Sequence, residues 1–335
     1  MRYDVVIIGA GPAGLKAAEV LASNGKKVVV FEKNKIIGKK VCAGGIAERD
    51  LEYIPRKLVE KEFDSFLMIS KNNKIRIKNK CYTLERENLG QYLSNKAKRA
   101  GAVIKTNTFV KKINKNSVIV DDKEYYFDYL IGADGSNSIV RQFLKIKSKA
   151  IALALQYKLN HVRKDLEVHY DPKTYYLWYI WIFPHKNYTS IGTAAPLQSK
   201  KRKYLRKTLE DFAKQNNFSV KNKEFEAALI NADYIGFRFN NIFLVGDAAG
   251  LVNPFTGEGI YQALVSGEEI AKKIIDPAYE CKKLRKIVNK HKKLLKLLLV
   301  LYKIPTLLRI IYWLGFKLLR YDRFQKRFIR TFLDY

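Results

Sequence analysis

The first 32 residues constrain the fold of this chain more than any other stretch. Residues 3–8 form a nearly continuous apolar run, which is typical of a strand buried on both faces. The sequence GAGPAG follows at residues 9–14, then a helical segment over residues 15–24 and a second apolar run over residues 28–31. This order of strand, glycine-rich turn, helix and strand predicts a βαβ unit.

The glycines of this unit have separate physical roles. Gly9 permits the tight turn from strand to helix, Gly11 lets a pyrophosphate approach the backbone, and Gly14 allows close packing of helix on strand. The free N–H groups at the helix start attract phosphates. Glu32 lies 23 residues after Gly9, where a carboxylate can accept hydrogen bonds from ribose hydroxyls. We predict a dinucleotide site, with a purely structural glycine turn as the alternative. This stretch alone does not distinguish NAD from FAD.

A second glycine-rich motif, FLVGDAAGLVNPFTGEGIYQAL, lies at residues 243–264. Its first residues predict a strand that delivers Asp247 to a position where the carboxylate can bond a ribityl hydroxyl. The turn Gly257-Glu258-Gly259-Ile260 then opens a helix. The dipole of that helix can stabilise negative charge on a reduced flavin by about 0.3–1 kcal/mol. Together with the first 32 residues, this motif favours FAD.

These motifs together are similar to the FAD enzymes of the para-hydroxybenzoate hydroxylase fold. The resemblance rests on GAGPAG with Glu32, on Arg86 before a helix, on GADGSNS at residues 132–138 and on residues 245–260. Cys42-Ala43-Gly44-Gly45 and the sequence YIWIFP at residues 179–184 further resemble the geranylgeranyl reductase family, nearest to its archaeal digeranylgeranylglycerophospholipid reductases. Such enzymes saturate isoprenoid chains of membrane lipids. The resemblance covers about residues 1–275.

The element pattern predicts an α/β fold in which a Rossmann-like FAD-binding domain carries an inserted, mainly antiparallel β-sheet substrate domain and a helical C-terminal tail. Within it we expect a hairpin in residues 63–84, helices over residues 87–100 and 200–215, and a helix break at Pro305. The expected units are the FAD-binding domain at residues 1–62, 81–149 and 236–275, the substrate domain at residues 63–80 and 150–235, and a basic helical region at residues 276–335.

The resemblance also implies roles for individual residues. Arg86 would contact the flavin-side phosphate or ribityl chain, Val110 the adenine through its backbone, and Asp247 the ribityl chain or pyrophosphate. The other implied cofactor-binding residues are Gly9, Gly11, Ala13, Gly14, Glu32, Cys42, Ala43, Gly45, Gly257, Gly259 and Ile260. Cys42 is the candidate catalytic residue, which would give a proton to the double bond or be positioned beside the flavin. The alternative is a small buried residue that fills a loop. Asp134 in GADGSNS either fixes a turn or lies near the pyrophosphate.

Residues 178–183 form an aromatic stripe that alternates with period two, so its two sets of side chains face opposite ways. One set can pack the domain while the other lines a cavity. We assign the substrate channel to Tyr179, Trp181 and Phe183, which leaves Trp178, Ile180 and Ile182 on the other face. A stripe that serves only as strand core is the alternative.

The net charge of +31 attracts polyanions, either an anionic membrane or nucleic acid, unless the lysines are simply spread over a solvated surface. Residues 281–335 hold 16 Lys and Arg against 2 Asp. The most apolar stretch of spanning length, residues 297–316, contains Lys303, Pro305 and Arg309. Insertion of the charged Lys303 and Arg309 into a bilayer costs roughly 5–7 kcal/mol, while insertion of the apolar residues is favourable by roughly 4–7 kcal/mol. A spanning helix is therefore not favoured.

An amphipathic tail agrees better with this sequence. Its expected apolar face comprises Leu307, Ile311, Leu314, Leu318, Ile329 and Phe332, and its basic face comprises Arg309, Arg320, Arg323, Arg327 and Arg330. Such a helix suits an anionic membrane surface. The alternative is a helix that packs its apolar face on the flavin domain.

The three cysteines are far apart, and the four histidines show no metal spacing, so we predict no metal site. Few cysteines and no secretory signal indicate a cytoplasmic protein, peripheral at the inner membrane surface. The predicted function is FAD-dependent reduction of isoprenoid double bonds in membrane lipids or their precursors. The electron donor would be NAD(P)H, ferredoxin or a reduced deazaflavin, and a nucleic-acid partner is disfavoured. The alternatives are a monooxygenase or halogenase acting on an aromatic substrate, and a non-catalytic flavoprotein that binds membrane or RNA.

Overall fold

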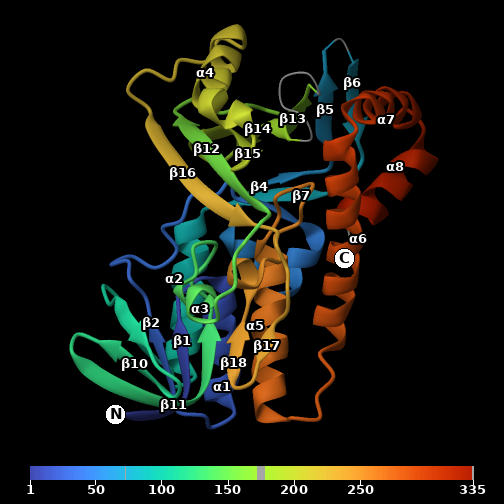
Figure 1. Ribbon diagram of the computed structural model, residues 1–335. Coiled ribbons are helices and arrows are strands. Elements are labelled where there is room, and N and C mark those ends of the chain that lie inside the picture. The colour runs from blue at the N-terminus through green and yellow to red at the C-terminus, as the bar shows by residue number, and fades with distance from the viewer. Residues whose placement is uncertain (72, 172–177, 334–335) are drawn as a thin grey trace.

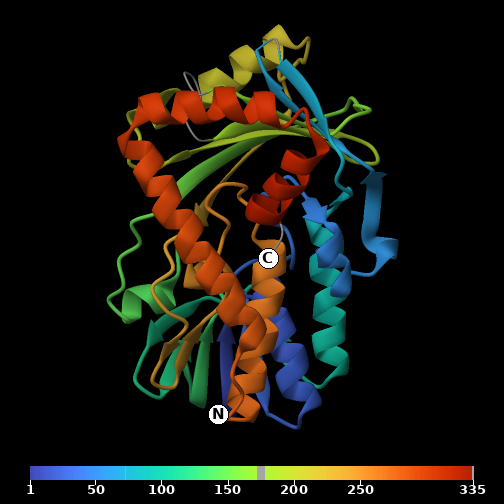
Figure 2. The same cartoon turned by 90° about the vertical axis from the view of Figure 1, so that its right-hand side faces the viewer.

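Two large sheets lie one above the other in this protein (Figure 1). The computed structural model describes residues 1–71, 73–171 and 178–333. The long helix α6 (Lys282–Lys303) runs along the side of both sheets, and α7 (Pro305–Leu318) then crosses beside the upper one (Figures 1 and 2). The C-terminal helices therefore span both halves of the molecule.

The lower sheet is the parallel α/β layer that the apolar runs predict. Strand β1 pairs in parallel with β2 and β11, β2 with β8, and β11 with β18. The path ends in an antiparallel strand, and an antiparallel β9–β10 pair is attached to β11. The strands are β1 (Arg2–Ile8), β2 (Val28–Phe31), β8 (Val103–Lys105), β9 (Val110–Ile113), β10 (Ser117–Val120), β11 (Lys123–Gly132), β17 (Arg238–Phe239) and β18 (Ile242–Leu244).

Helices α1 (Pro12–Ser23), α2 (Arg86–Arg99), α3 (Ile139–Phe143) and α5 (Ile260–Ile275) belong to this lower layer. The turn from β1 into α1 requires glycine. A Cβ at Gly9, where φ is +103°, would lie 2.3 Å from the Ala133 carbonyl oxygen, and one at Gly14 would lie 2.1 Å from that of Gly9. Helix α5 begins at Ile260, three residues later than Gly257, because the intervening turn is not helical.

The upper sheet is mainly antiparallel, in the order β16-β12-β15-β14-β13-β5-β6, with only β5 and β13 parallel. Its strands are β5 (Phe66–Ser70), β6 (Asn73–Ile77), β12 (Ile151–Leu159), β13 (Glu167–Tyr170), β14 (Tyr179–Pro184), β15 (Thr189–Pro196) and β16 (Glu224–Asn231). Helix α4 (Leu205–Gln215) packs on it through an apolar stripe of Leu205, Leu209, Phe212 and Ala213. The two sheets together confirm the predicted fold class.

The hairpin predicted in residues 63–84 is confirmed only for β5 and β6. Strand β7 (Cys81–Leu84) instead pairs with β4 (Val59–Phe63) and β3 (Gly45–Ala47) in a separate three-stranded sheet. This small sheet places residues 45 and 81 on neighbouring strands, which brings the cysteine-containing loop to the level between the two large sheets.

The C-terminal helices break where Pro305 predicts, since α6 ends at Lys303 and α7 begins at Pro305. The single apolar face predicted over residues 307–332 is wrong. Helix α7 ends at Leu318, and α8 (Asp322–Phe328) starts a new axis that continues into a π-helical turn at Ile329–Leu333. Among the residues that the structure describes, none of the helices combines the length and apolarity needed to cross a bilayer.

Candidate active site

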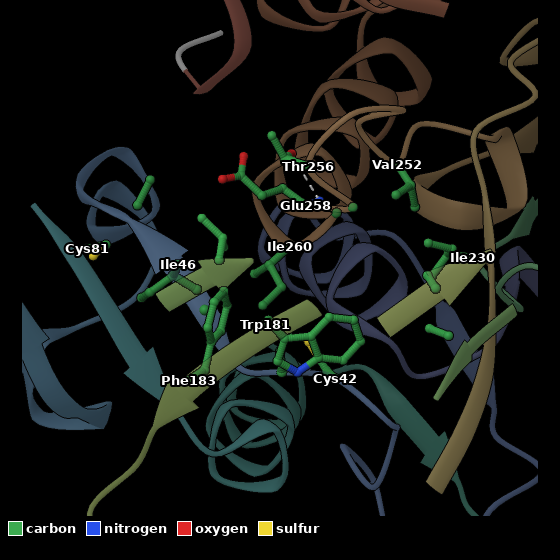
Figure 3. A pocket seen from close by; sticks show the side chains of 18 of the residues that line it. Cys42, Ile46, Cys81, Trp181, Phe183, Ile230, Val252, Thr256, Glu258 and Ile260 are labelled. Carbon is green, nitrogen blue, oxygen red and sulfur yellow. Dashed lines mark hydrogen bonds between the residues drawn. The ribbon is translucent and has the colours of Figure 1, made fainter. Parts of the chain in front are cut away.

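A cavity of about 240 Å³ lies where the two large sheets and the C-terminal helices meet. Its walls come from the loop at residues 40–47, the aromatic strand β14, the start of α5 and two side chains of the tail, Phe328 and Leu333. In the view of Figure 3, Cys42, Trp181 and Phe183 gather in one part of this space, below Ile260 and the Thr256–Glu258 turn. The cavity therefore joins segments that are far apart in the sequence.

The loop that carries Cys42 forms one wall. Cys42 is partly buried, and its Sγ accepts a hydrogen bond from the Gly44 N–H at 3.4 Å. Ala43 and Gly45 line the same wall. A second thiol, Cys81, also lines the cavity, and burial together with the nearby Glu258 charge raises its pKa to about 12. Cys81 is therefore held as a neutral thiol.

Strand β14 shows the alternation that its sequence predicts. Tyr179, Trp181 and Phe183 line the cavity, whereas Ile180 and Ile182 are fully buried on the other face among the apolar side chains that pack against α4. Trp178 does not follow the alternation: it precedes β14 and also lines the cavity, although the period-two pattern placed it with the isoleucines.

Polar contacts orient Trp181 and Tyr179. The Trp181 Nε1–H donates to Ser190 Oγ at 3.0 Å, and the Tyr179 hydroxyl donates to the Thr256 carbonyl at 2.5 Å. A Cβ at Gly192 would lie 2.1 Å from the Trp181 ring, so only glycine fits beneath it. Burial raises the pKa of Tyr179 well above its ordinary value, so its hydroxyl remains a donor. Both rings are thereby fixed with their apolar parts toward the cavity.

Asp247 lies in the turn after β18, close to the start of α5. Its Oδ2 accepts from Lys40 Nζ at 2.9 Å and from Ser136 Oγ at 3.1 Å. A Cβ at Gly259 would lie 3.4 Å from Asp247 Oδ1. Lys40 and Ser136 were not among the predicted site residues. Ser136 could have been predicted from the sequence, because it belongs to GADGSNS. Lys40 stands among several lysines, and nothing in the sequence distinguishes it from them.

Arg86 begins α2 and is only 7% exposed, yet it lines the cavity. Among the described residues its Nη1 has no hydrogen-bond partner. Leaving a buried donor unsatisfied costs about 1–3 kcal/mol, and more for a charged group. A guanidinium in this position fits an anionic ligand group such as a phosphate, which would satisfy that donor.

Glu32 lies apart from the cavity, at the ends of β1 and β2. Its Oε2 accepts from the Ala10 N–H and its Oε1 from the Asn34 N–H, both at 2.8 Å, so the carboxylate is held firmly in place. The Thr108 N–H donates to the Glu32 carbonyl oxygen at 2.9 Å, which brings the segment leading into Val110 alongside. The structure thus separates the predicted residues into this group and the group around the cavity.

The backbone at the α1 turn leaves room for a ligand. A Cβ at Gly11 would meet only the Ala133 carbonyl oxygen, at 3.9 Å, unlike the close contacts at Gly9 and Gly14. Ala13, buried two residues later, would contact Gly246 and Gly267 if those glycines carried side chains. The open face at Gly11 and the unpaired Nη1 of Arg86 are the two observations that fit a bound dinucleotide.

Asp134 has a clear structural role. Its Oδ2 accepts from the Ile139 and Val140 N–H groups at 2.7 and 3.3 Å, which caps the start of α3, and burial raises its pKa. The buried Arg141 of α3 donates to the carbonyl oxygens of Asp233 and Ala248. Asp134 therefore fixes the start of α3, and Arg141 of that helix bonds the turn that carries Asp247. No group of His, Cys, Asp or Glu within the described parts of the chain has the arrangement of a metal site.

Comparisons with known proteins agree with this geometry. The family described as FAD binding domain matches residues 2–279. An uncharacterized protein of Methanosarcina barkeri is 31% identical, over 79% of this chain and 73% of its own length. The digeranylgeranylglycerophospholipid reductase of Methanocaldococcus jannaschii is 29% identical, over 81% of this chain and 78% of its own. A geranylgeranyl bacteriochlorophyll reductase-like protein of Thermoplasma acidophilum has the same fold, with a TM-score of 0.73 over 97% of this chain and 90% of that one, at 24% identity.

Proposed function

Because this chain belongs to the family of FAD-binding domains, and is an FAD-dependent oxidoreductase, we propose that it reduces the double bonds of isoprenoid chains in membrane lipids or their precursors. One observation carries the proposal: an apolar, aromatic cavity meets the Cys42 loop and the start of α5 in the same space. The digeranylgeranylglycerophospholipid reductase at 29% identity supports this choice of substrate class.

The residues on both sides of the fold suit the cofactor. Gly11 and the N-terminus of α1 would hold the pyrophosphate and Glu32 a ribose, while Arg86 and Asp247 would hold the flavin half. FAD bound here and reduced by NAD(P)H, reduced ferredoxin or a reduced deazaflavin would supply a hydride, which carries both electrons of the reduction. The start of α5 directs its free N–H groups toward this half of the site, where they favour negative charge.

A double bond that gains a hydride at one carbon must gain a proton at the other. We assign that proton to the Cys42 thiol, or to a water that it holds. The Gly44 N–H already bonds the Cys42 sulfur, and the same hydrogen bond would stabilise the thiolate left behind. Solvent then returns the proton. A positioned proton donor contributes roughly 10²–10⁴-fold to the rate of such a step.

The cavity walls suit a hydrocarbon chain. Beyond β14, the wall continues through Val168 and Tyr170 of β13 and through Phe328 and Leu333 of the tail. Tyr170 is in turn covered by α7, with ring centroids 5.5 Å from Tyr312. The C-terminal region therefore closes the substrate side of the cavity.

We further propose that this region rests on an anionic membrane surface. Ten of the twenty exposed large apolar side chains of the described residues lie within residues 297–321, less than a tenth of the chain. They are Leu297, Leu299, Val300, Ile304, Ile310, Ile311, Trp313, Leu314, Leu318 and Tyr321. Exposed basic residues accompany them, Arg309, Lys317 and Arg320 among them. Apolar patches with a basic rim mark membrane contact sites.

The proposal is tested with purified, FAD-loaded protein and unsaturated archaeal-type lipids under anaerobic reduction with dithionite. We expect mass spectrometry to show two added hydrogens per bond reduced, and Cys42→Ala to lower the rate roughly 100-fold or more. Cys81→Ala is the matched control, because Cys81 lines the same cavity as a neutral thiol with a raised pKa. Protein purified without flavin, or lipids that keep their mass with every donor, would refute the proposal. Oxidation of NAD(P)H stimulated by an aromatic substrate would point instead to a monooxygenase or halogenase.

A further inference from the structure

A buried histidine holds the back of the Cys42 loop. His185 directly follows the last residue of β14, is only 1% exposed and stacks on the Tyr188 ring with centroids 4.3 Å apart. Its Nε2 lies 2.9 Å from the Ala43 carbonyl oxygen, and its Nδ1 lies 2.6 Å from Glu60 Oε2 on β4. The imidazole therefore connects the small three-stranded sheet to the loop that carries Cys42.

The partners of the ring decide where its hydrogens lie. A carbonyl oxygen only accepts, so the hydrogen bond to Ala43 requires a hydrogen on Nε2. A short contact from Nδ1 to a carboxylate oxygen requires a second proton between those two atoms. His185 and Glu60 thus share one proton beyond the neutral imidazole, as a charge-assisted pair inside the protein. Without that proton the ring has one N–H for two acceptors, and it cannot serve both.

The glycines of the loop allow the ring to approach this closely. A Cβ at Gly44, where φ is +72°, would lie 2.6 Å from His185 Cε1 and 2.3 Å from the Leu84 carbonyl oxygen. A Cβ at Gly45 would lie 2.5 Å from the Phe183 ring. The two glycines after Cys42-Ala43 and the residues at the end of β14 therefore fit each other, although they are far apart in the sequence.

We propose that His185, clamped by Glu60, is a positioning residue that fixes the Ala43 carbonyl and thereby sets the place of the Cys42 thiol in the cavity. This inference rests on the proposed reductase function, in which Cys42 delivers the proton. Gln156 of β12 gives the loop a weaker second hold, because its Nε2 lies 3.4 Å from the Cys42 carbonyl oxygen. Residues of the upper sheet and its flanking turn thus contact the carbonyl oxygens of both Cys42 and Ala43.

The charged and titratable groups around the clamp come from several elements. Glu60 faces Nδ1, and the Tyr188 ring covers one side of the imidazole while its hydroxyl donates to Glu85 at 2.7 Å. Burial and this bond to Glu85 raise the pKa of Tyr188, so the phenol stays neutral. Lys158 lies over the Tyr188 ring, 5.3 Å from its centroid. Of these groups only Glu60 bonds the imidazole, so it controls the shared proton.

The experiment measures how readily Cys42 of the FAD-loaded protein reacts with iodoacetamide, resolved by peptide mass spectrometry. In His185→Phe, which keeps the ring but loses both N–H groups, we expect labelling of Cys42 to speed up roughly five- to tenfold, as loss of one hydrogen bond implies. Cys81 in the same sample should stay nearly unlabelled in the wild type and in the variants, because its pKa is raised to about 12 and the thiolate is the reactive form. His161→Phe, at an exposed histidine, is the matched control and should label like the wild type.

Two further variants keep the test decisive. Glu60→Gln keeps the size of the side chain but removes its charge, so it should also speed Cys42 labelling, even if His185→Phe does not fold. His185→Gln keeps one N–H donor and should give an intermediate rate. For lipid turnover we expect kcat to fall in His185→Phe and Glu60→Gln with little change in KM, because the cavity walls are intact. Unchanged Cys42 labelling in folded, FAD-loaded His185→Phe and Glu60→Gln would overturn the inference.

Failure of the reductase proposal would be seen separately. Thiol labelling does not depend on turnover. Faster Cys42 labelling in the variants, with no lipid reduction by the wild type, would support the positioning role of His185 and refute only the assigned reaction. Lipid reduction by the wild type, with normal Cys42 labelling in both variants, would support the assigned reaction and refute the positioning role of His185.

Discussion

Trp313 offers the sharpest test of membrane contact by α7. Its side chain is 58% exposed, and Lys317 Nζ lies 3.9 Å from the centre of its ring. Full burial of an aromatic side chain covers about 150–250 Å², so transfer of the exposed part into a bilayer surface removes roughly 90–140 Å² from water. At about 25 cal/mol per Å² this contributes roughly 2–3.5 kcal/mol. Trp313→Ala should therefore weaken vesicle binding by about 2 kcal/mol, or roughly 30-fold.

Cosedimentation with vesicles that contain phosphatidylglycerol, compared with vesicles of phosphatidylcholine alone, measures this loss directly. Fluorescence gives a second measure, because the chain has three tryptophans and Trp178 and Trp181 line the cavity. Wild-type emission should shift to the blue when Trp313 leaves water, and Trp313→Ala should lack the shift. Binding should also weaken with salt, since residues 281–335 carry a net charge of +14.

The matched control is Phe143→Ala at the end of α3 in the lower layer, which removes an aromatic ring that is 38% exposed. This variant should bind vesicles like the wild type. Membrane contact through Trp313 is refuted if Trp313→Ala binds anionic vesicles as tightly as the wild type, or if both variants lose affinity equally. The melting temperature of Trp313→Ala should stay close to that of the wild type, because most of its side chain is in water.

Three other predictions concern the interior. Arg86→Met should weaken FAD binding roughly 10- to 100-fold in equilibrium titrations. The melting temperature of the apoprotein should not fall, because the substitution removes a buried donor that lacks a partner. Arg99→Met is the control on the same helix. Burial is the main cause that raises the pKa of Asp50 to about 7 in the native state, whereas the unfolded chain has a pKa of about 3.9. Between these pH values the native state binds more protons than the unfolded state, so the free energy of unfolding should fall as pH rises through them. Asp50→Asn should flatten that fall in denaturant titrations at pH values from about 4 to 7, and an equally steep fall in the variant would contradict this assignment. Gly45→Ala, whose Cβ would lie 2.5 Å from the Phe183 ring, should displace that ring and slow lipid reduction, measured by mass spectrometry per mole of bound FAD.

Local chemistry explains why some parts of this protein could be predicted from its sequence. The turn at Gly9 and Gly14 depends on the absence of a side chain, which the sequence states directly, and the buried strand β1 follows from a continuous apolar run. The alternation of β14 likewise separates Trp181 from Ile182 because successive residues of a strand face opposite ways.

Contacts between distant segments left no such signal. Lys40 bonds Asp247 and His185 bonds Ala43, yet neither residue carries a periodicity or motif that marks its partner. Helix α7 was ambiguous for another reason, because apolar residues occur all around it. It buries Leu308 and leaves Leu314 exposed, and the choice depends on the neighbours that it packs against rather than on its own pattern.

Membrane contact, as proposed above, would give a function to the apolar residues on both sides of α7. The buried side of α7 places Tyr312 and Phe316 against Tyr170, with ring centroids 5.5 and 6.4 Å away, and Tyr170 lines the cavity. The exposed side carries Ile311 and Leu314, which are 42% and 43% exposed. A helix with its side chains is about 10–12 Å across, so a bilayer in contact with the exposed side lies one helix diameter from the cavity wall. On this proposal an isoprenoid chain would pass along α7 without entering bulk water, which would account for the apolar residues on both sides of the helix.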